Sequence, residues 1–215
     1  MNKISAISSI LAVALSSGCA SSVAIKTPPI QATDLGSQKR TSGKYAVWVQ
    51  SGGWKATVDT DHNLGQVCKF PTDFNSAYTQ AAHQAFQSAF ESPVFVDETI
   101  PAGELKKRGL DAQIIIYQGS IAGKFAGTQD FFTQTYMSNV KMDGIVAIIG
   151  PAGLIAQQTV NGSGSSAHKP DIFSGGCDAA ISPAIMKAGE IALKDFVVKA
   201  TNVAKIGVLE SKAGN

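Results

Sequence analysis

The apolar run Ile114-Ile115-Ile116-Tyr117 constrains the fold more than any other part of the sequence. Its side chains are apolar on both faces of a strand, which is typical of a strand in the middle of a sheet. The longer segment 112–121 is therefore predicted to be a strand. A central strand of this kind needs neighbouring strands and covering helices elsewhere in the chain.

Two amphipathic helices are predicted to provide that cover. The first begins after Pro71-Thr72-Asp73 and ends near Glu91, because Pro93 disfavours helix at the residue before it. The second opens at Ser182-Pro183, where a capping residue precedes proline at the first helical position. Both carry small and apolar residues at helical spacing, which suits close packing on a sheet.

The remaining elements complete the expected fold. Short strands are predicted at 44–50, 54–59, 94–97, 131–142, 144–149 and 154–160, a short helix at 101–108, and a Gly/Ser loop at 161–166. This order predicts an α+β fold, a two-layer sandwich in which a mixed, mostly antiparallel sheet of about five strands carries two long helices on one face.

The first twenty residues have the pattern of a secretory signal. Lys3 gives a charged start, residues 4–15 form an apolar stretch, and small residues follow it. The apolar stretch is too short to span a bilayer. The chain is therefore expected to be exported.

The end of this signal, Leu15-Ser16-Ser17-Gly18-Cys19, resembles the lipobox of bacterial lipoproteins, whose cysteine is acylated and becomes the new N-terminus. It departs from that pattern at Ser16, where an aliphatic residue is usual. With Ala20 after the cysteine, the resemblance implies a periplasm-facing anchor in the outer membrane. The alternative is ordinary cleavage after Ala20, which gives a soluble secreted protein.

The cysteine count agrees with the lipobox. The chain has three cysteines, and acylation of Cys19 leaves Cys68 and Cys177. Two thiols in an oxidising compartment are expected to form a disulfide. Two separately buried free thiols remain the alternative.

Together these features predict four regions. They are a signal peptide (1–18), a lipidated N-terminus with a flexible tether (19–42), a single periplasmic α/β domain (43–208) and a disordered tail (209–215).

The composition excludes several functions. The formal net charge of +2 gives no field for binding nucleic acid. The histidines at 62, 83 and 168 lie far apart in the sequence, and His83 is expected to be an exposed residue of the first helix. We therefore expect no enzyme activity and no cofactor.

Two polar features are weaker candidates for binding. Asp59 and Asp61 start a calcium-type loop, but Leu64 replaces its glycine and Phe70 its final glutamate, so a solvated loop is favoured. The basic run 106–108 is either a solvated helix end or a contact for acidic headgroups.

Two apolar features complete the candidates. Trp48 is expected in the core, while Trp54, beside Ser51-Gly52-Gly53, is a candidate for an exposed anchor. The hairpin at 145–156 is expected to be core, or else a tongue that faces a membrane or a subunit.

The order of elements resembles a group of small periplasmic α/β lipoproteins. They include the curli-secretion lipoprotein and its exopolysaccharide-export relatives, activators of peptidoglycan synthases, and the amino-terminal domain of the Tol propeller protein. The resemblance rests on the lipobox at Cys19, strand 45–49, helix 74–90, strand 112–117, the hairpin around Pro151 and helix 185–203. It implies an accessory or assembly component of an envelope machine, with outer-membrane lipid and an envelope protein or a second copy as partners. The alternative is a ligand-binding lipoprotein for a lipid, glycan or cation.

Overall fold

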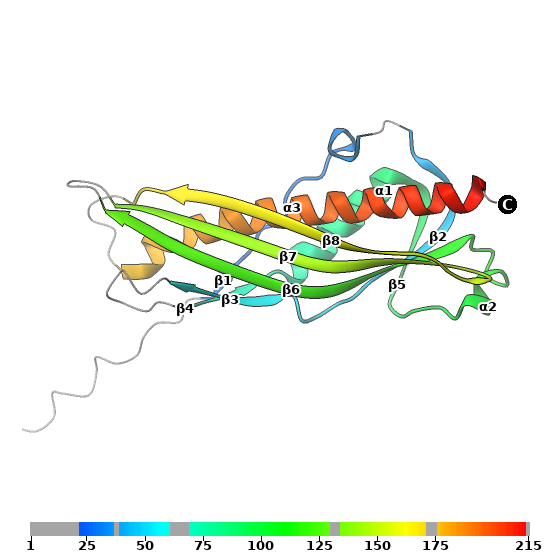
Figure 1. Ribbon diagram of the computed structural model, residues 1–215, viewed down its shortest axis with the longest axis horizontal. Helices are drawn as coiled ribbons and strands as arrows, with labels where there is room; N and C mark the ends of the chain where they lie inside the picture. The colour runs from blue at the N-terminus through cyan, green and yellow to red at the C-terminus, as the bar shows by residue number, and fades with distance from the viewer. Residues whose placement is uncertain (1–21, 37–38, 61–68, 130–133, 171–175, 214–215) are drawn as a thin grey trace, which may run out of the picture.

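A computed structural model shows one large mixed sheet with its main helices on one side (Figure 1). The sheet has eight strands among the described residues, where about five were expected. The structure describes residues 22–36, 39–60, 69–129, 134–170 and 176–213.

Three long antiparallel strands run the whole length of the molecule. They are β6 (Ala112–Gln129), β7 (Gln134–Gly150) and β8 (Gly153–His168). The turn between β7 and β8 uses Pro151 and Ala152, followed by Gly153 at φ 124°, a backbone conformation that favours glycine. Pro151 was expected at the tip of a hairpin, and that prediction is confirmed.

Five short strands line the other edge of β6. The first half of β6 pairs in parallel with β2, which pairs in turn with β5. The second half pairs in parallel with β3, followed by β4 and β1. These strands are β1 (Val23–Ala24), β2 (Thr41–Val49), β3 (Lys55–Thr60), β4 (Lys69–Asp73) and β5 (Phe90–Val96). The apolar run at 114–117 thus lies inside the sheet, as its sequence predicts.

The two longer helices cover one face of this sheet. They are α1 (Asn75–Ala89) and α3 (Gly176–Ala213), which contact each other and share one large core with β2, β6 and β7. The short helix α2 (Ala102–Leu105) closes a small cluster around Ala46 and Leu105 on the other face. A 3-10 turn, η1 (Ala32–Leu35), packs against both α1 and α3.

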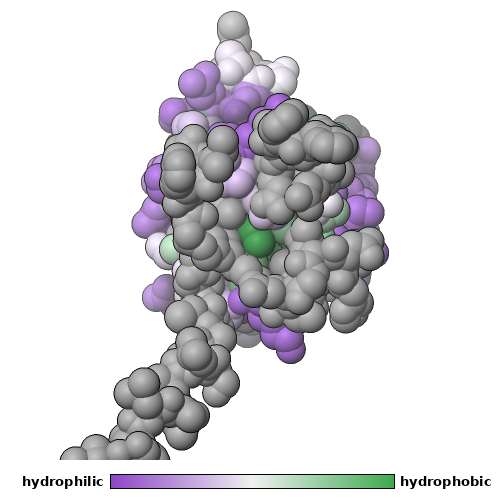
Figure 2. All heavy atoms as spheres, turned by 90° about the vertical axis from the view of Figure 1, so that its left-hand side faces the viewer, coloured by the Kyte–Doolittle hydropathy of each residue, from purple (hydrophilic) through white to green (hydrophobic). Residues whose placement is uncertain are grey.

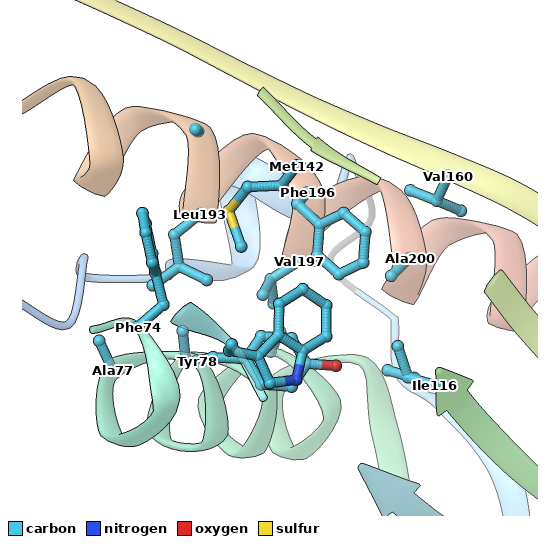
Figure 3. Packing of buried hydrophobic residues seen from close by; sticks show 14 of the residues in the cluster. Phe74, Ala77, Tyr78, Ile116, Met142, Val160, Leu193, Phe196, Val197 and Ala200 are labelled. Carbon is cyan, nitrogen blue, oxygen red and sulfur yellow. The ribbon is translucent and has the colours of Figure 1, made fainter. Parts of the chain in front are cut away.

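Aromatic side chains fill the core between α1, α3 and the sheet (Figure 3). Trp54 is fully buried, stacks on Tyr78 with a centroid distance of 3.9 Å, and meets the edge of Phe196 at 5.4 Å. Its indole N–H donates to the Gln50 carbonyl at 3.0 Å. Stacked and edge-to-face rings of this kind stabilise a core beyond their buried area.

Glycines in β8 allow the backbone of α3 to pack directly on the backbone of the strand. A Cβ at Gly162 would lie 2.4 Å from the Ala192 carbonyl oxygen, and one at Gly164 would lie 2.2 Å from that of Ala188. No side chain fits into such distances, so only glycine permits this packing.

The same contact corrects a prediction. The Gly/Ser segment 161–166 was expected to be a loop, but it is the second half of β8. Its small residues are required by the helix above them and are not a turn signal. The strands predicted at 131–142 and 144–149 are also one continuous strand, β7, which pairs with β6 on one side and β8 on the other.

Helix α3 is longer than expected at both ends. Pro183 lies inside it, because the buried Ile181 and Ala184 on either side keep the helix on the core. At the other end the helix continues to Ala213, so the tail expected from residue 209 is helical as far as the structure describes it.

The segment expected to be a flexible tether packs on the body over much of its length. Val23 and Ala24 form β1 beside β4, and Val23, Ile25 and Leu35 are buried. Asp34 forms an ion pair with Lys194 of α3 at 2.9 Å. The backbone N–H of Gln31, and then Lys194, lower the pKa of Asp34. The apolar residues between 23 and 35 lack a regular period, which is why the sequence did not reveal their burial.

A buried hydroxyl in this core gives a first prediction. The Tyr78 hydroxyl has no hydrogen-bond partner among the described residues, and burial raises the pKa of Tyr78 well above its ordinary value. We expect Tyr78→Phe to raise the free energy of unfolding by about 1 kcal/mol, because it removes an unsatisfied buried group and keeps the stacked ring. Urea denaturation measures the change.

Tyr45→Phe is the matched control. Tyr45 is equally buried, but its hydroxyl donates to the Ser42 carbonyl at 2.8 Å. Its removal should therefore lower the free energy of unfolding by about 1 kcal/mol. Equal changes of the same sign in the two variants would contradict the assignment.

Candidate interaction surface

Exposed apolar side chains gather at the end of the molecule where β7 turns into β8. Leu154 is 63% exposed and Ile155 39%, and both follow the turn. Ile206 and Leu209 in the last turns of α3 are 54% and 53% exposed. The turn and the end of α3 lie at the same end of the molecule (Figure 1), where Gly207 packs over Ile148 and Ala156. We call Leu154, Ile155, Ile206 and Leu209 the apolar end patch.

The opposite end has a different surface. β1 and β4 do not reach that end: β1 lies level with the middle of β6, and the chain enters the described fold there (Figure 1). In the view onto the end opposite the patch, hydrophilic residues lie around the rim and hydrophobic surface shows at the centre (Figure 2). Exposed apolar surface on a monomer typically marks a contact site, and the apolar end patch is the better candidate because it holds the three most exposed large apolar side chains of the described residues.

The sequence only half revealed this patch. The hairpin at 145–156 was a candidate for a membrane-facing or subunit-facing tongue, and it supplies Leu154 and Ile155. The first strand of that hairpin is largely core, since Val146, Ala147 and Ile148 are buried. Ile206 and Leu209 were missed, although their signal was present: they are apolar residues that lie off the buried stripe of α3.

The basic run Lys106-Lys107-Arg108 directly follows α2 and is exposed. Lys107 pairs with Glu104 at 2.7 Å, with both side chains largely in solvent. The run lies toward the end of the molecule that carries the apolar end patch (Figure 1). An exposed ion pair of this kind contributes little to stability, which fits a solvated surface.

Of the acidic candidates, Asp59 lies in β3, where its register partners are Lys69 on one side and Lys124 on the other. Asp61 lies outside the described residues. Within the described part of the chain, no cluster of three or more His, Cys, Asp or Glu residues could hold a metal ion.

The histidines are not brought together by the described fold. His83 of α1 packs its ring on Phe95 with a centroid distance of 3.9 Å, and partial burial lowers its pKa. It is therefore less exposed than expected. His168 ends β8, and His62 lies outside the described residues.

The two tryptophans have the reverse of their expected roles. Trp54, the candidate for an exposed anchor, is fully buried, because the turn before it directs the chain back under α1. Trp48 is only partly buried, and its ring meets that of Tyr117 with a centroid distance of 5.6 Å. Its indole N–H donates to the Asp97 carbonyl at 3.1 Å. Trp48 lies on the opposite side of β2 from the core residue Val47.

The cysteine predictions are not tested. Cys19 and Cys68 lie outside the described residues, and of Cys177 only the helical backbone of α3 is described. Acylation of Cys19 and the disulfide between Cys68 and Cys177 stay predictions.

A shallow depression of about 380 Å³ lies along β3 and β4. Its charged side chains are Lys55 and Asp73, which form an ion pair with each other at 3.6 Å.

No helix in the described part of the chain is long and apolar enough to cross a membrane.

Comparisons with known proteins add evidence on the fold alone. No protein-family model and no curated protein sequence matches the chain. Among solved structures, protein XCC0632 from Xanthomonas campestris, described by the DUF330 family model, aligns with a TM-score of 0.52 at 9% identity, over 90% of this chain and 99% of that one. The chain shares its fold with this protein. At such low identity the likeness carries no information on activity.

Two other bacterial structures align less well. A putative neuraminyllactose-binding hemagglutinin homologue from Helicobacter pylori gives a TM-score of 0.44 at 12% identity, over 85% of this chain and 95% of that one. The hypothetical protein CT253 from Chlamydia trachomatis gives 0.37 at 9% identity, over 78% and 99%. The resemblance to the curli, peptidoglycan-synthase and Tol lipoproteins stays a prediction.

Proposed function

We propose that the chain is a lipid-anchored protein of the outer membrane that faces the periplasm. It acts without catalysis, as an accessory or assembly component of an envelope machine, through protein–protein contacts. The observation that carries the proposal is the separation of the chain's entry into the fold from the apolar end patch. The chain enters the described fold through β1, level with the middle of β6, and the apolar end patch lies away from it at one end of the molecule.

The anchor is supported by the sequence from Leu15 to Cys19. The contact function is supported by the chemistry of the patch. Its side chains are aliphatic and well exposed, which costs free energy in water unless a partner covers them. A membrane contact at the patch fits less well, because acyl chains on Cys19 would bind lipid near β1, which lies away from the patch.

The ligand-binding alternative has weaker support. The depression along β3 and β4 is shallow, and its lysine and aspartate already neutralise each other.

The anchor is tested by labelling cells that express the full chain with a palmitate analogue. We expect the wild-type protein to carry the label and to fractionate with membranes, because Cys19 is acylated. Cys19→Ser should lose the label and move to the soluble fraction. Cys68→Ser is the matched control and should keep both the palmitate label and the fractionation with membranes. A label that persists in Cys19→Ser, or an unlabelled mature chain that begins at Ser21, would overturn the anchor.

The contact function is tested by the native mass of the detergent-extracted protein with whatever co-purifies. We expect a defined complex for the wild type and its loss in the double variant Leu154→Asp, Leu209→Asp. A lone monomer in both cases would overturn the proposed function.

A further inference from the structure

The edge of the sheet formed by β8 is long and uncharged. β8 pairs with β7 and with no other strand among the described residues. Its 16 residues include no Pro, Lys, Arg, Asp or Glu. Natural proteins usually protect such edges with charges, prolines or a covering element, because an open edge pairs readily with another strand.

The protection present here covers only parts of the strand. The outward N–H of Ser163 donates to the Asp195 carboxylate of α3 at 3.0 Å, and this closes the edge at that residue. An irregularity in the pairing of β7 and β8 at Ile148/Ile149 disturbs the strand near Ile155. Between these two points, no described residue bonds the outward backbone groups of Gln157, Thr159 and Asn161, which alternate in phase with Ser163. We call residues 156–162 the open edge segment.

Helix α3 runs beside this segment. Gly162 contacts Ala192 and Phe196, and Ala156 lies under Gly207. By interpolation, Thr159 at the centre of the segment is level with about residue 200 of α3. Ile191 is 39% exposed and Leu209 53%, and they are five helical turns apart on one face of α3.

We propose that two copies of this chain pair through their open edge segments, antiparallel about a two-fold axis at Thr159. This inference names the partner in the contact function proposed above and rests on that function. The pairing places Thr159 opposite itself and Gln157 opposite Asn161 of the second copy. It joins the two sheets into one and sets the two α3 helices side by side and antiparallel.

The side chains of α3 favour a second copy over another partner. The two-fold axis passes α3 at about residue 200. Ile191 lies nine residues before that point and Leu209 nine residues after it, so Ile191 of one copy is level with Leu209 of the second copy. Asp195, which also pairs with Lys199 of its own chain at 2.8 Å, lies five residues before that point and Lys205 five after it, so each Asp195 carboxylate is level with the Lys205 ammonium group of the second copy. Lys205 forms no ion pair with a described residue. A self-complementary apolar and charge pattern is what a two-fold interface requires.

The mass of the full chain in detergent, measured by sedimentation over a range of concentrations, tests the pairing. We expect a dimer for the wild type and self-association weakened at least about tenfold by Gln157→Lys with Thr159→Lys, since four lysines would then meet at the axis. Ala122→Lys with Asn139→Lys adds the same charge to exposed positions in the middle of the sheet, away from this edge, and should leave the dimer intact.

A cross-link tests the register. Under oxidation Thr159→Cys should give a covalent dimer, because paired Cα atoms about 5.5 Å apart permit a disulfide, while Asn139→Cys should not. A wild-type monomer, or a dimer unaffected by the lysines at 157 and 159, would overturn the pairing. A monomer that still binds another envelope protein overturns only the second copy as partner. A dimer without an acyl group overturns only the anchor.

Discussion

We expect Trp54→Ala to lower the free energy of unfolding by about 3–5 kcal/mol. Trp54 is fully buried, and its ring packs on both Tyr78 of α1 and Phe196 of α3. Its removal therefore leaves a cavity where the two helices and the sheet meet. The loss also leaves the Gln50 carbonyl without the indole donor. Urea denaturation followed by circular dichroism measures the effect.

Trp48→Ala is the matched control. The same atoms are removed, but from a partly buried ring that contacts Tyr117 on the other side of the sheet. Trp48 buries less apolar surface than Trp54, and its removal leaves a gap that is open to solvent. We therefore expect the free energy of unfolding to fall by only about 1–2 kcal/mol. Equal losses for the two tryptophans would contradict the arrangement of the core described above.

We expect Gly164→Ala to lower the free energy of unfolding by about 3 kcal/mol. The added methyl group would lie 2.2 Å from the Ala188 carbonyl oxygen and 2.5 Å from the Ala192 nitrogen. Both atoms belong to the backbone of α3, so no rotamer change relieves the contact. The helix must move away from β8, and the neighbouring core contacts of Phe196 weaken with it.

Gly103→Ala controls for the chemistry of the substitution. A Cβ at Gly103 in α2 meets nothing within 4 Å. We expect a change within about 0.5 kcal/mol, or a small gain, because alanine favours helix over glycine. A Gly164→Ala protein as stable as the Gly103→Ala protein would show that α3 does not rest directly on β8.

The parts of the fold that the sequence predicted are those whose pattern reflects burial directly. The strand at 45–49, the start of β6 at Ala112 and helix α1 all have side chains whose periodicity matches the face they bury. The turn at Pro151 was found because proline fixes its own φ and glycine permits a positive φ, and both properties are typical of turns.

The parts that the sequence missed depend on contacts between distant segments. The second half of β8 contains glycine and serine because α3 needs the space, and such residues have low strand propensity by themselves. Helix α1 begins after Pro71-Thr72-Asp73 as expected, but the sequence did not reveal that these three residues lie in β4, which pairs with β3 and ends beside the two-residue β1. The burial of Trp54 follows from the packing of α1 on α3, which the order of residues does not specify.

The candidate surface was predictable to a similar extent. The hairpin was noticed because its apolar run is long, and its exposed part, Leu154 and Ile155, belongs to the apolar end patch. The open edge of β8 was not noticed, since strand order in a sheet follows from tertiary pairing.

The length of the three long strands has a consequence for reach. Strands of 16 to 18 residues extend for about 55 Å at roughly 3.3 Å per residue. With Cys19 acylated as proposed, only four residue steps separate the lipid from Val23 of β1, a leash of about 14 Å at most. The body would then act as a rigid spacer, and its orientation against the bilayer would decide how far into the periplasm the far tip can meet other components.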